Sequence, residues 1–218
     1  MGEITSWDSF YGEEVTPMKD FLGNFYSAEF FEEIHTRTPK GILEVGSGTG
    51  VMTIFLSHLG YDVVSIDNNE VVLKKAQKNN KHYNGTVKFK FGDAFKIPFK
   101  NGSFDMAISQ GFFEHFNNEE IKKLLDEQLR VARKSVLISV PNSYYPVLDR
   151  GDERLRPLEW WLGLFRQMCP HHKVSGFDYQ FMLRRNYPFK TFYRLFRGQK
   201  VQSLIIIEKA NDKKMNDQ

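Results

Sequence analysis

The amino-acid sequence predicts an α/β protein built on a doubly wound, mostly parallel sheet. Short apolar segments alternate with amphipathic segments between residues 41 and 140, and a glycine-rich turn follows the first apolar segment. Alternation of this kind is typical of parallel strands joined by helices that cover both faces of a sheet. Short connections and right-handed crossovers then favour the doubly wound arrangement.

The residues before this alternation predict an N-terminal helix. Phenylalanine, leucine and tyrosine recur at helical spacing from Lys19 to His35, and Pro39 ends the pattern. Trp7 and Tyr11 lie further upstream. They are candidates either to fold over a ligand as part of an N-terminal cap or to pack locally.

The alternating region predicts five strands and three helices. The expected strands are 41–45, 62–66, 87–91, 104–109 and 135–140. The expected helices are 49–59, 70–82 and a third that opens at Asn117. Asn69 is placed to cap the second helix, and Asn117 with Glu120 has the spacing of a capping box.

The alternation of predicted strands and helices ends after Pro141. Residues 142–173 are rich in aromatic side chains and show no clear strand, whereas 174–183 and 200–208 are expected to be late strands at an antiparallel edge. A short helix is expected over 188–196 between them. The polar tail from residue 211 is expected to fray.

Composition narrows the class of protein. The chain has 218 residues, which suits one α/β domain, and Cys169 is its only cysteine, which excludes an intrachain disulfide or a thiolate metal cluster. No apolar run approaches the ~20 residues of a membrane span, and the first five residues do not resemble a secretory signal. A cytoplasmic protein is therefore expected. The net charge of +3 does not by itself indicate nucleic acid, and no DNA partner is expected.

The strongest chemical signal is the turn after the first strand. Residues 44–50 read Glu-Val-Gly-Ser-Gly-Thr-Gly, and glycines at alternate positions let the backbone turn sharply and approach a ligand. The helix that follows points free N–H groups toward the same place. In an open parallel sheet this turn lies at the carboxyl ends of the strands, where ligands bind.

Two acidic turns at the same sheet edge support a nucleoside site. Asp67 ends the second strand, where a carboxylate can accept hydrogen bonds from both hydroxyls of a ribose. Asp93 follows the third strand. A dinucleotide fingerprint needs glycine where this chain has Val51, and Glu44 would repel a pyrophosphate. Glu44 instead suits a cationic ligand.

These residues resemble the class I S-adenosylmethionine-dependent methyltransferases, in the branch that methylates small molecules. The resemblance covers residues 40–141. It rests on the 44–50 turn, on Asp67, on Asp93-Ala94, on the strand from Phe104, and on Phe113-Glu114-His115-Phe116, which is similar to the family's Leu-Glu-His-Val element. The place after the fourth strand reads Ser-Gln-Gly-Phe rather than Asn-Pro-Pro-Tyr, which counts against amine methylators of DNA and protein.

The resemblance implies a Rossmann-like sheet of seven strands with the last one antiparallel, and S-adenosyl-L-methionine as cofactor. It implies one domain over 1–218: an N-terminal helical cap (1–39), a cofactor-binding core (40–141), and a substrate-side lid with the last two strands (142–210). The implied cofactor-binding residues are Glu44, Gly46, Ser47, Gly48, Asp67, Asn68, Asp93, Ala94 and Gln110.

The acceptor side is less defined by sequence. His115 is a candidate base or, alternatively, a packing residue, and His171-His172 is a second candidate pair; no metal site is expected. Tyr144, Tyr145 and Trp160 are candidate substrate-binding residues, together with Asp149. A base is required only where the acceptor arrives protonated.

Residues 151–200 carry ten Lys/Arg and four Asp/Glu among many aromatics. This composition suits a pocket for a small anionic or aromatic molecule, an RNA-binding face, a lipid-facing helix, or simply a solvated basic surface. The expected function is methyl transfer to an oxygen or nitrogen of a small-molecule acceptor. An RNA- or lipid-directed methyltransferase, a non-catalytic cofactor-binding protein and an NAD-dependent oxidoreductase are the alternatives.

Overall fold

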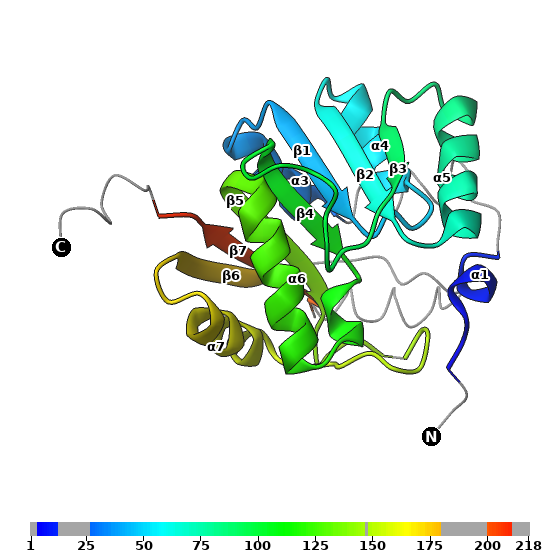
Figure 1. The fold of residues 1–218 in the computed structure, drawn as a ribbon. Coiled ribbons are helices and arrows are strands. Elements are labelled where there is room, and N and C mark those ends of the chain that lie inside the picture. Colours follow the sequence, from blue (N-terminus) through cyan, green and yellow to red (C-terminus); the bar gives the residue numbers. More distant parts are fainter. Residues whose placement is uncertain (1–3, 13–26, 147, 180–199, 211–218) are drawn as a thin grey trace.

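One seven-stranded sheet organises the computed structural model, which describes residues 4–12, 27–146, 148–179 and 200–210 (Figure 1). The strands are β1 Gly41–Val45, β2 Asp62–Asp67, β3 Lys88–Phe91, β4 Phe104–Gln110, β5 Ala132–Pro141, β6 Lys173–Tyr179 and β7 Gln202–Glu208. The helices are α1 Trp7–Phe10, α3 Ala28–Thr36, α4 Val51–His58, α5 Glu70–His82, η1 Phe113–His115, α6 Asn118–Val131 and α7 Leu158–Met168.

The strand order is β3-β2-β1-β4-β5-β7-β6. Strands β1 to β5 pair in parallel, and β7 runs antiparallel to both β5 and β6. The order reverses between β1 and β4, which creates the crevice at the carboxyl ends of the strands where ligands bind in such sheets. The predicted doubly wound, mostly parallel sheet with an antiparallel edge is confirmed.

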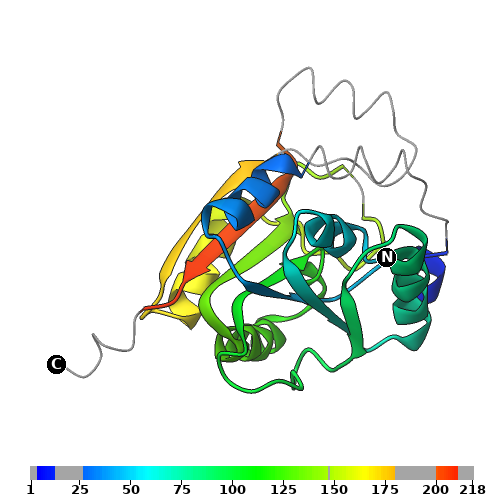
Figure 2. The same cartoon turned by 90° about the horizontal axis from the view of Figure 1, so that it is seen from above.

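Helices cover both faces of the sheet (Figure 2). One core joins α3 and α4 to the face that includes Ile42 and Ile108, and the other joins α6 and α7 to the face that includes Val136 and Ile138. Successive strand residues point to opposite faces, so the consecutive apolar residues Val136, Leu137 and Ile138 of β5 supply both cores at once.

Capping residues set where the helices begin. Gly50 adopts φ +75° as the N-cap of α4, so this helix begins at Val51 and not at Thr49. Asn69 accepts hydrogen bonds from the N–H groups of Val71 and Val72, and Asn117 forms the predicted capping box with Glu120. Orphan N–H groups at a helix start are thereby satisfied locally.

The largest further differences from expectation concern β5 and the 142–173 region. α6 passes directly into β5 at Ala132, three residues earlier than predicted, because Phe104 of β4 pairs with Ala132 across an irregularity in the register. The 142–173 region contains α7, whose apolar side packs on β6 and β7. The expected helix over 19–35 is described only as α3. Three expected segments lie outside the described residues: the first part of the 19–35 helix, the end of the 174–183 strand, and the 188–196 helix.

No helix in the described ranges is long and apolar enough to cross a bilayer.

Candidate active site

The glycine-rich turn is hydrogen-bonded to the end of the neighbouring strand. The N–H groups of Gly46 and Ser47 both donate to the carbonyl of Ile66, at 3.0 and 3.2 Å. Since Val45 pairs with Ile66 across the sheet, the turn begins at the same level as Asp67. The first two parts of the predicted site therefore lie side by side.

The turn requires glycine for its backbone. Gly46, Gly48 and Gly50 have φ of +86°, +50° and +75°. A β-carbon on Gly46 would lie 3.0 Å from the ring of Phe112, and one on Gly50 would lie 2.7 Å from the ring of Phe89. The loop is thus packed by aromatic rings on two sides and leaves no room for a side chain.

The Asp67 carboxylate stands partly exposed at the tip of β2. It accepts a hydrogen bond from the N–H of Asn69 at 2.9 Å. Burial raises the pKa of Asp67, although backbone N–H groups of Asn69, Gly48, Ser47 and Asn68 act in the opposite direction. An accessible carboxylate beside the glycine turn can accept further hydrogen bonds from hydroxyl groups.

Glu44 lies in the interior beneath the turn. Its Oε2 accepts hydrogen bonds from the Ser65 hydroxyl at 2.5 Å and the Thr53 hydroxyl at 3.2 Å, and the Ser47 and Ser65 hydroxyls are 2.7 Å apart. Burial raises the pKa of Glu44 to about 8. The group is therefore largely protonated near neutral pH, and it ties β1 to β2 and α4. Contact with a cationic ligand stays a prediction.

The remaining predicted cofactor residues follow the same edge. Asn68 is exposed beside Asp67, whereas the Asp93 carboxylate accepts from the N–H of Phe95 and shapes the turn before Ala94. Gln110 ends β4, and its amide donates to the hydroxyl of Tyr179 on β6 at 3.3 Å. Ala94 packs between two core clusters beside Phe112.

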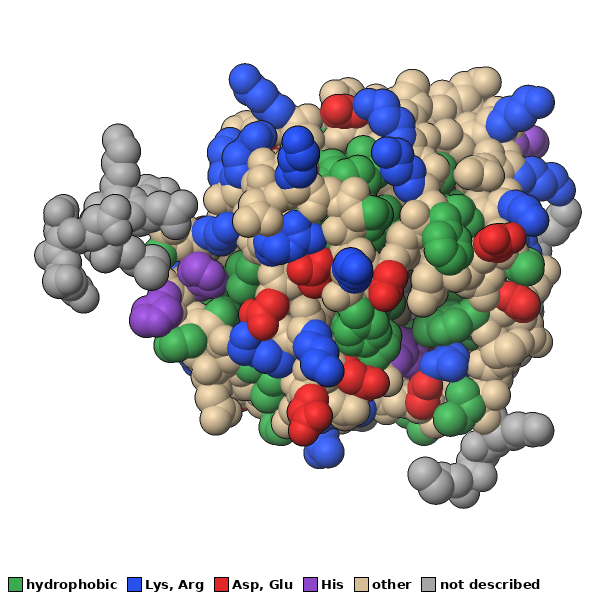
Figure 3. Space-filling model, in the orientation of Figure 1, with side chains coloured by type: hydrophobic (Ala, Val, Ile, Leu, Met, Phe, Trp, Pro, Cys, Tyr) green, Lys and Arg blue, Asp and Glu red, His purple; other side chains and the backbone are tan. Residues whose placement is uncertain are grey.

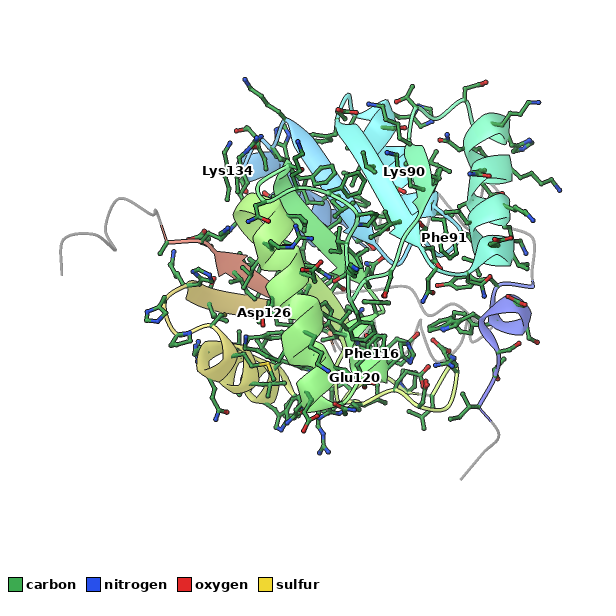
Figure 4. The ribbon with its side chains drawn as sticks, in the orientation of Figure 1. Lys90, Phe91, Phe116, Glu120, Asp126 and Lys134 are labelled. Atoms are coloured by element: carbon green, nitrogen blue, oxygen red, sulfur yellow. The ribbon has the colours of Figure 1, made fainter. Side chains whose placement is uncertain are left out.

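Aromatic side chains form a rim near these turns. Phe91 is 59% exposed, and the rings of Phe95 and Phe116 meet edge to face at 5.6 Å. Figure 3 shows hydrophobic side chains exposed among charged ones on this face, and Figure 4 places Phe91 at the end of β3 and Phe116 near the start of α6.

His115 lies on η1, beyond the tip of β4, and forms a close pair with Asp152. Its Nδ1 is 2.7 Å from Asp152 Oδ1, and its side chain is 6% exposed. The Trp7 ring of α1 covers it edge to face at 5.0 Å. Burial lowers the pKa of His115 below its usual 6.5, with Asp152 and Glu153 acting against this and Arg150 reinforcing it. The imidazole is therefore neutral near pH 7.

Glu114 is the second buried carboxyl group of this edge. It is 2% exposed, and its Oε2 has no hydrogen-bond partner among the described residues. Burial raises its pKa to about 8. His115 Nε2 lies 3.8 Å from Glu114 Oε1, which is longer than a hydrogen bond. Glu114 is thus a neutral acid on the far side of the imidazole from Asp152.

Ligand atoms of His115, Asp152 and Glu153 lie within 4.8 Å of one another, a spacing that one metal ion could bridge. The carboxylates already have protein partners. Arg150 pairs with Asp152 Oδ2, and the N–H groups of Arg150 and Gly151 donate to Glu153. The guanidinium supplies the positive charge there, so we do not assign this cluster to a metal.

The predicted acceptor residues divide into two groups. Tyr145 is buried and its hydroxyl donates to Asp149 at 2.6 Å, close to the His115 edge, while Tyr144 is exposed next to it. Trp160 lies at the start of α7, and the guanidinium groups of Arg154 and Arg156 are 5.0 and 5.5 Å from its ring centre. A substrate contact for these three remains a prediction.

His171 and His172 do not join the site. They precede β6, whose first residue Lys173 pairs with Glu208 of β7. Glu208 pairs in turn with Ser135 in the first half of β5. That is the amino-terminal edge of the parallel strands, opposite the glycine turn.

The N-terminal segment joins both halves of the site. A β-carbon on Gly48 would lie 2.8 Å from the Tyr11 hydroxyl, and Asn69 donates to Asp8 at 2.8 Å. Trp7 on the same helix covers His115. The sequence left open whether Trp7 and Tyr11 form a cap or pack locally. It gave no signal for Asp152 or Arg150, because the irregular segment that contains them has no periodicity.

Comparison with known proteins finds methyltransferases among the proteins similar to this chain. Residues 42–135 match a family model described as methyltransferase domain. The chain is 26% identical over 133 residues to ajmaline N-methyltransferase of Rauvolfia serpentina, covering 59% of this chain and 45% of that protein. It is 28% identical over 170 residues to O-methyltransferase cnsE of Penicillium expansum, covering 76% and 58%. The chain thus spans about half the length of these relatives.

Among solved structures, magnesium protoporphyrin IX methyltransferase of Synechocystis with bound S-adenosylmethionine superposes with a TM-score of 0.63. The two chains are 13% identical, and the match covers 94% of this chain and 89% of the other. At this identity the likeness concerns the fold.

Proposed function

We propose that this chain transfers a methyl group from S-adenosylmethionine to a small-molecule acceptor. The premise is that residues 42–135 form a methyltransferase domain of the class I fold. One observation carries the proposal: the 46–50 turn and the Asp67 carboxylate meet at one edge of the sheet, and the His115–Asp152 pair stands further along that edge. A candidate donor site and a candidate acceptor site thus lie along the same edge of the sheet.

The residues present fit this cofactor. The open backbone of the glycine turn and the N-terminus of α4 can receive the carboxylate of its amino-acid portion. Asp67 can accept from both ribose hydroxyls, and the aromatic rim of Phe91, Phe95 and Phe116 offers apolar surface for a base. Bound there, the cofactor would supply an electrophilic methyl group on a sulfonium leaving group.

The protein's contribution is mainly alignment and exclusion of water, which are strong sources of acceleration for a displacement between two positioned groups. Trp7 of α1 covers His115, and Tyr11, the residue that follows α1, closes onto Gly48. We assign the acceptor side to the segment 148–156 and to Tyr145, whose hydroxyl donates to Asp149.

His115 is the candidate base for an acceptor that arrives as a hydroxyl or an ammonium group. A carboxylate oxygen of Asp152 faces Nδ1, which favours a proton on that nitrogen, and an Nε2 without a proton could then act as the base. The neutral state imposed by burial is the state that a base requires. An oxygen or nitrogen acceptor is also consistent with the named activities of the relatives, one an N- and one an O-methyltransferase.

The experiment is an incubation of the whole chain with S-adenosylmethionine labelled in its methyl group and a panel of phenols, carboxylic acids and amines. Label in a small organic product, together with release of S-adenosylhomocysteine, is expected. Calorimetric binding of S-adenosylhomocysteine without label transfer to any member of the panel or to a cell extract would indicate a cofactor-binding protein without catalysis. Label found in RNA or lipid would show that the acceptor is that RNA or lipid and not a small molecule.

A further inference from the structure

Asp152 reaches His115 from a loop that the methyltransferase-domain match does not include. The loop 148–156 is fastened to η1 by two hydrogen bonds: the N–H of Arg154 donates to the Glu114 carbonyl at 3.0 Å, and the Arg154 guanidinium donates to the Phe116 carbonyl at 2.6 Å. These bonds hold the loop against the segment that carries His115. Arg154 therefore keeps the loop close enough for the 2.7 Å contact between Asp152 Oδ1 and His115 Nδ1.

Arg150 orients the same carboxylate. Its guanidinium pairs with Asp152 Oδ2, the oxygen that does not face His115. The guanidinium is itself held, because its Nε donates to the Thr5 carbonyl at 3.0 Å and it stacks 4.4 Å from the ring centre of Trp7. The Thr5 N–H also donates to the Arg150 carbonyl at 3.0 Å. Each oxygen of Asp152 thus has an assigned partner.

We propose that Asp152, oriented by Arg150, is the positioning residue that keeps the proton of His115 on Nδ1 and leaves Nε2 free to accept a proton from the methyl acceptor. The inference rests on the proposed function for its catalytic consequence, but the tautomer can be measured without any acceptor. The charged groups that face His115 are Asp152, Glu153 and Arg150 of the loop 148–156 and Glu114 of η1.

Because Arg150 and His115 hold one oxygen each of Asp152, we expect Asp152→Asn to be more damaging than Asp152→Ala. In Asp152→Asn the side-chain oxygen must face Arg150, since a guanidinium has no acceptor. The amide NH₂ then faces His115 Nδ1 and donates to it, which moves the imidazole proton to Nε2 and abolishes its basic lone pair there. In Asp152→Ala neither tautomer is imposed, so part of the population keeps a free Nε2. A purely structural role predicts the reverse order, with asparagine the milder change.

The tautomer is read by long-range proton–nitrogen NMR on the full chain labelled in histidine, with His115 assigned from the signal lost in His115→Gln. The wild-type spectrum is expected to show Nδ1 protonated and Nε2 bare near neutral pH. Asp152→Asn is expected to invert the two, Asp152→Ala to give a mixture, and the neighbouring Glu153→Gln to leave the wild-type pattern. An Nε2–H tautomer in the wild type, or an unchanged tautomer in Asp152→Asn, would overturn the proposal.

Methyl transfer supplies the second readout, using whichever acceptor in the panel takes the label. Asp152→Asn is expected to lower kcat by about 10²- to 10⁴-fold, and by more than Asp152→Ala, with S-adenosylhomocysteine affinity unchanged. Equal losses in both variants with the predicted tautomers would overturn the catalytic part. If the wild type does not bind S-adenosylhomocysteine, the proposed function is wrong, while the NMR result still decides whether Asp152 positions the imidazole.

Discussion

The hydroxyl of Tyr11 stands 2.8 Å from the point where a β-carbon on Gly48 would lie. A residue of the N-terminal segment therefore closes directly onto the backbone of the glycine turn. Lys75 of α5 donates to the Tyr11 carbonyl and holds that segment in place. This contact makes the turn sensitive to the smallest side chain.

Gly48→Ala is expected to displace Tyr11 and to weaken S-adenosylhomocysteine binding by about 10-fold or more, at a cost in stability of about 1 kcal/mol for a left-handed alanine. Gly60→Ala is the matched control, because Gly60 has φ +89° and a β-carbon placed on it would meet nothing within 4 Å. It is expected to lose a similar amount of stability with no change in affinity. Calorimetry and thermal unfolding measure the two effects, and equal affinity in both variants would contradict the closure of Tyr11 onto the turn.

Asp67→Ala is expected to weaken S-adenosylhomocysteine binding by about 10- to 150-fold for each charge-assisted hydrogen bond lost to the ribose hydroxyls. Asp62→Ala removes an exposed aspartate from the other end of β2, where it pairs with Lys88. That control is expected to bind as tightly as the wild type. Unchanged affinity in Asp67→Ala would remove the ribose assignment.

Glu44 is expected to make stability fall as pH rises. The folded chain keeps the Glu44 proton up to about pH 8, whereas the unfolded chain releases it near its ordinary value of 4.5. Between these values the unfolded state binds fewer protons, so the free energy of unfolding decreases with pH. The difference in Tm between wild type and Glu44→Gln should therefore shift in favour of the variant between about pH 5 and about pH 8.

The control for this prediction is Glu32→Gln, an exposed acid on α3. Its Tm difference from wild type is expected to stay flat over the same range. A flat difference for Glu44→Gln as well would mean that Glu44 is ionised in the folded protein.

Trp7→Ala is expected to raise the pKa of His115 toward 6.5, because the Trp7 ring covers the imidazole and burial is the main cause of its lowered pKa. Proton NMR titration of the His115 ring follows the shift. Trp160→Ala is the control, since Trp160 contacts Arg154 and Arg156 rather than the imidazole. A His115 pKa that moves down, or equally in both variants, would show that Trp7 does not shield it.

The same protonation state sets the acid side of the activity profile. His115 acts as a base only when neutral, so the rate should fall as pH drops below its pKa, which lies under 6.5. Asp152→Ala removes the group that raises this pKa, so the acid limb should move to lower pH. A measured kcat against pH for the two proteins tests the direction, and a shift to higher pH would contradict it.

Local patterns in the sequence determined much of this protein. Apolar periodicity predicts the strands and helices from β1 to β5, since side-chain burial follows the 2.0 and 3.6 periods of strand and helix. Glycine at three alternate positions predicts the turn, because residues with a side chain rarely adopt the left-handed backbone conformation that such a turn uses. Asp67 could be placed beside that turn because parallel strands end at a common edge.

Tertiary packing alone decided the rest. His115 and Asp152 are separated by 37 positions and meet only because Arg154 ties one irregular loop to η1. The sequence does not show whether Glu44 faces a ligand or the interior. Tertiary packing buries it, which raises its pKa, and places the Ser65 and Thr53 hydroxyls where they hydrogen-bond to it. Contacts between distant irregular segments leave no periodic trace, because they depend on how the helices and loops pack and not on any repeating local geometry.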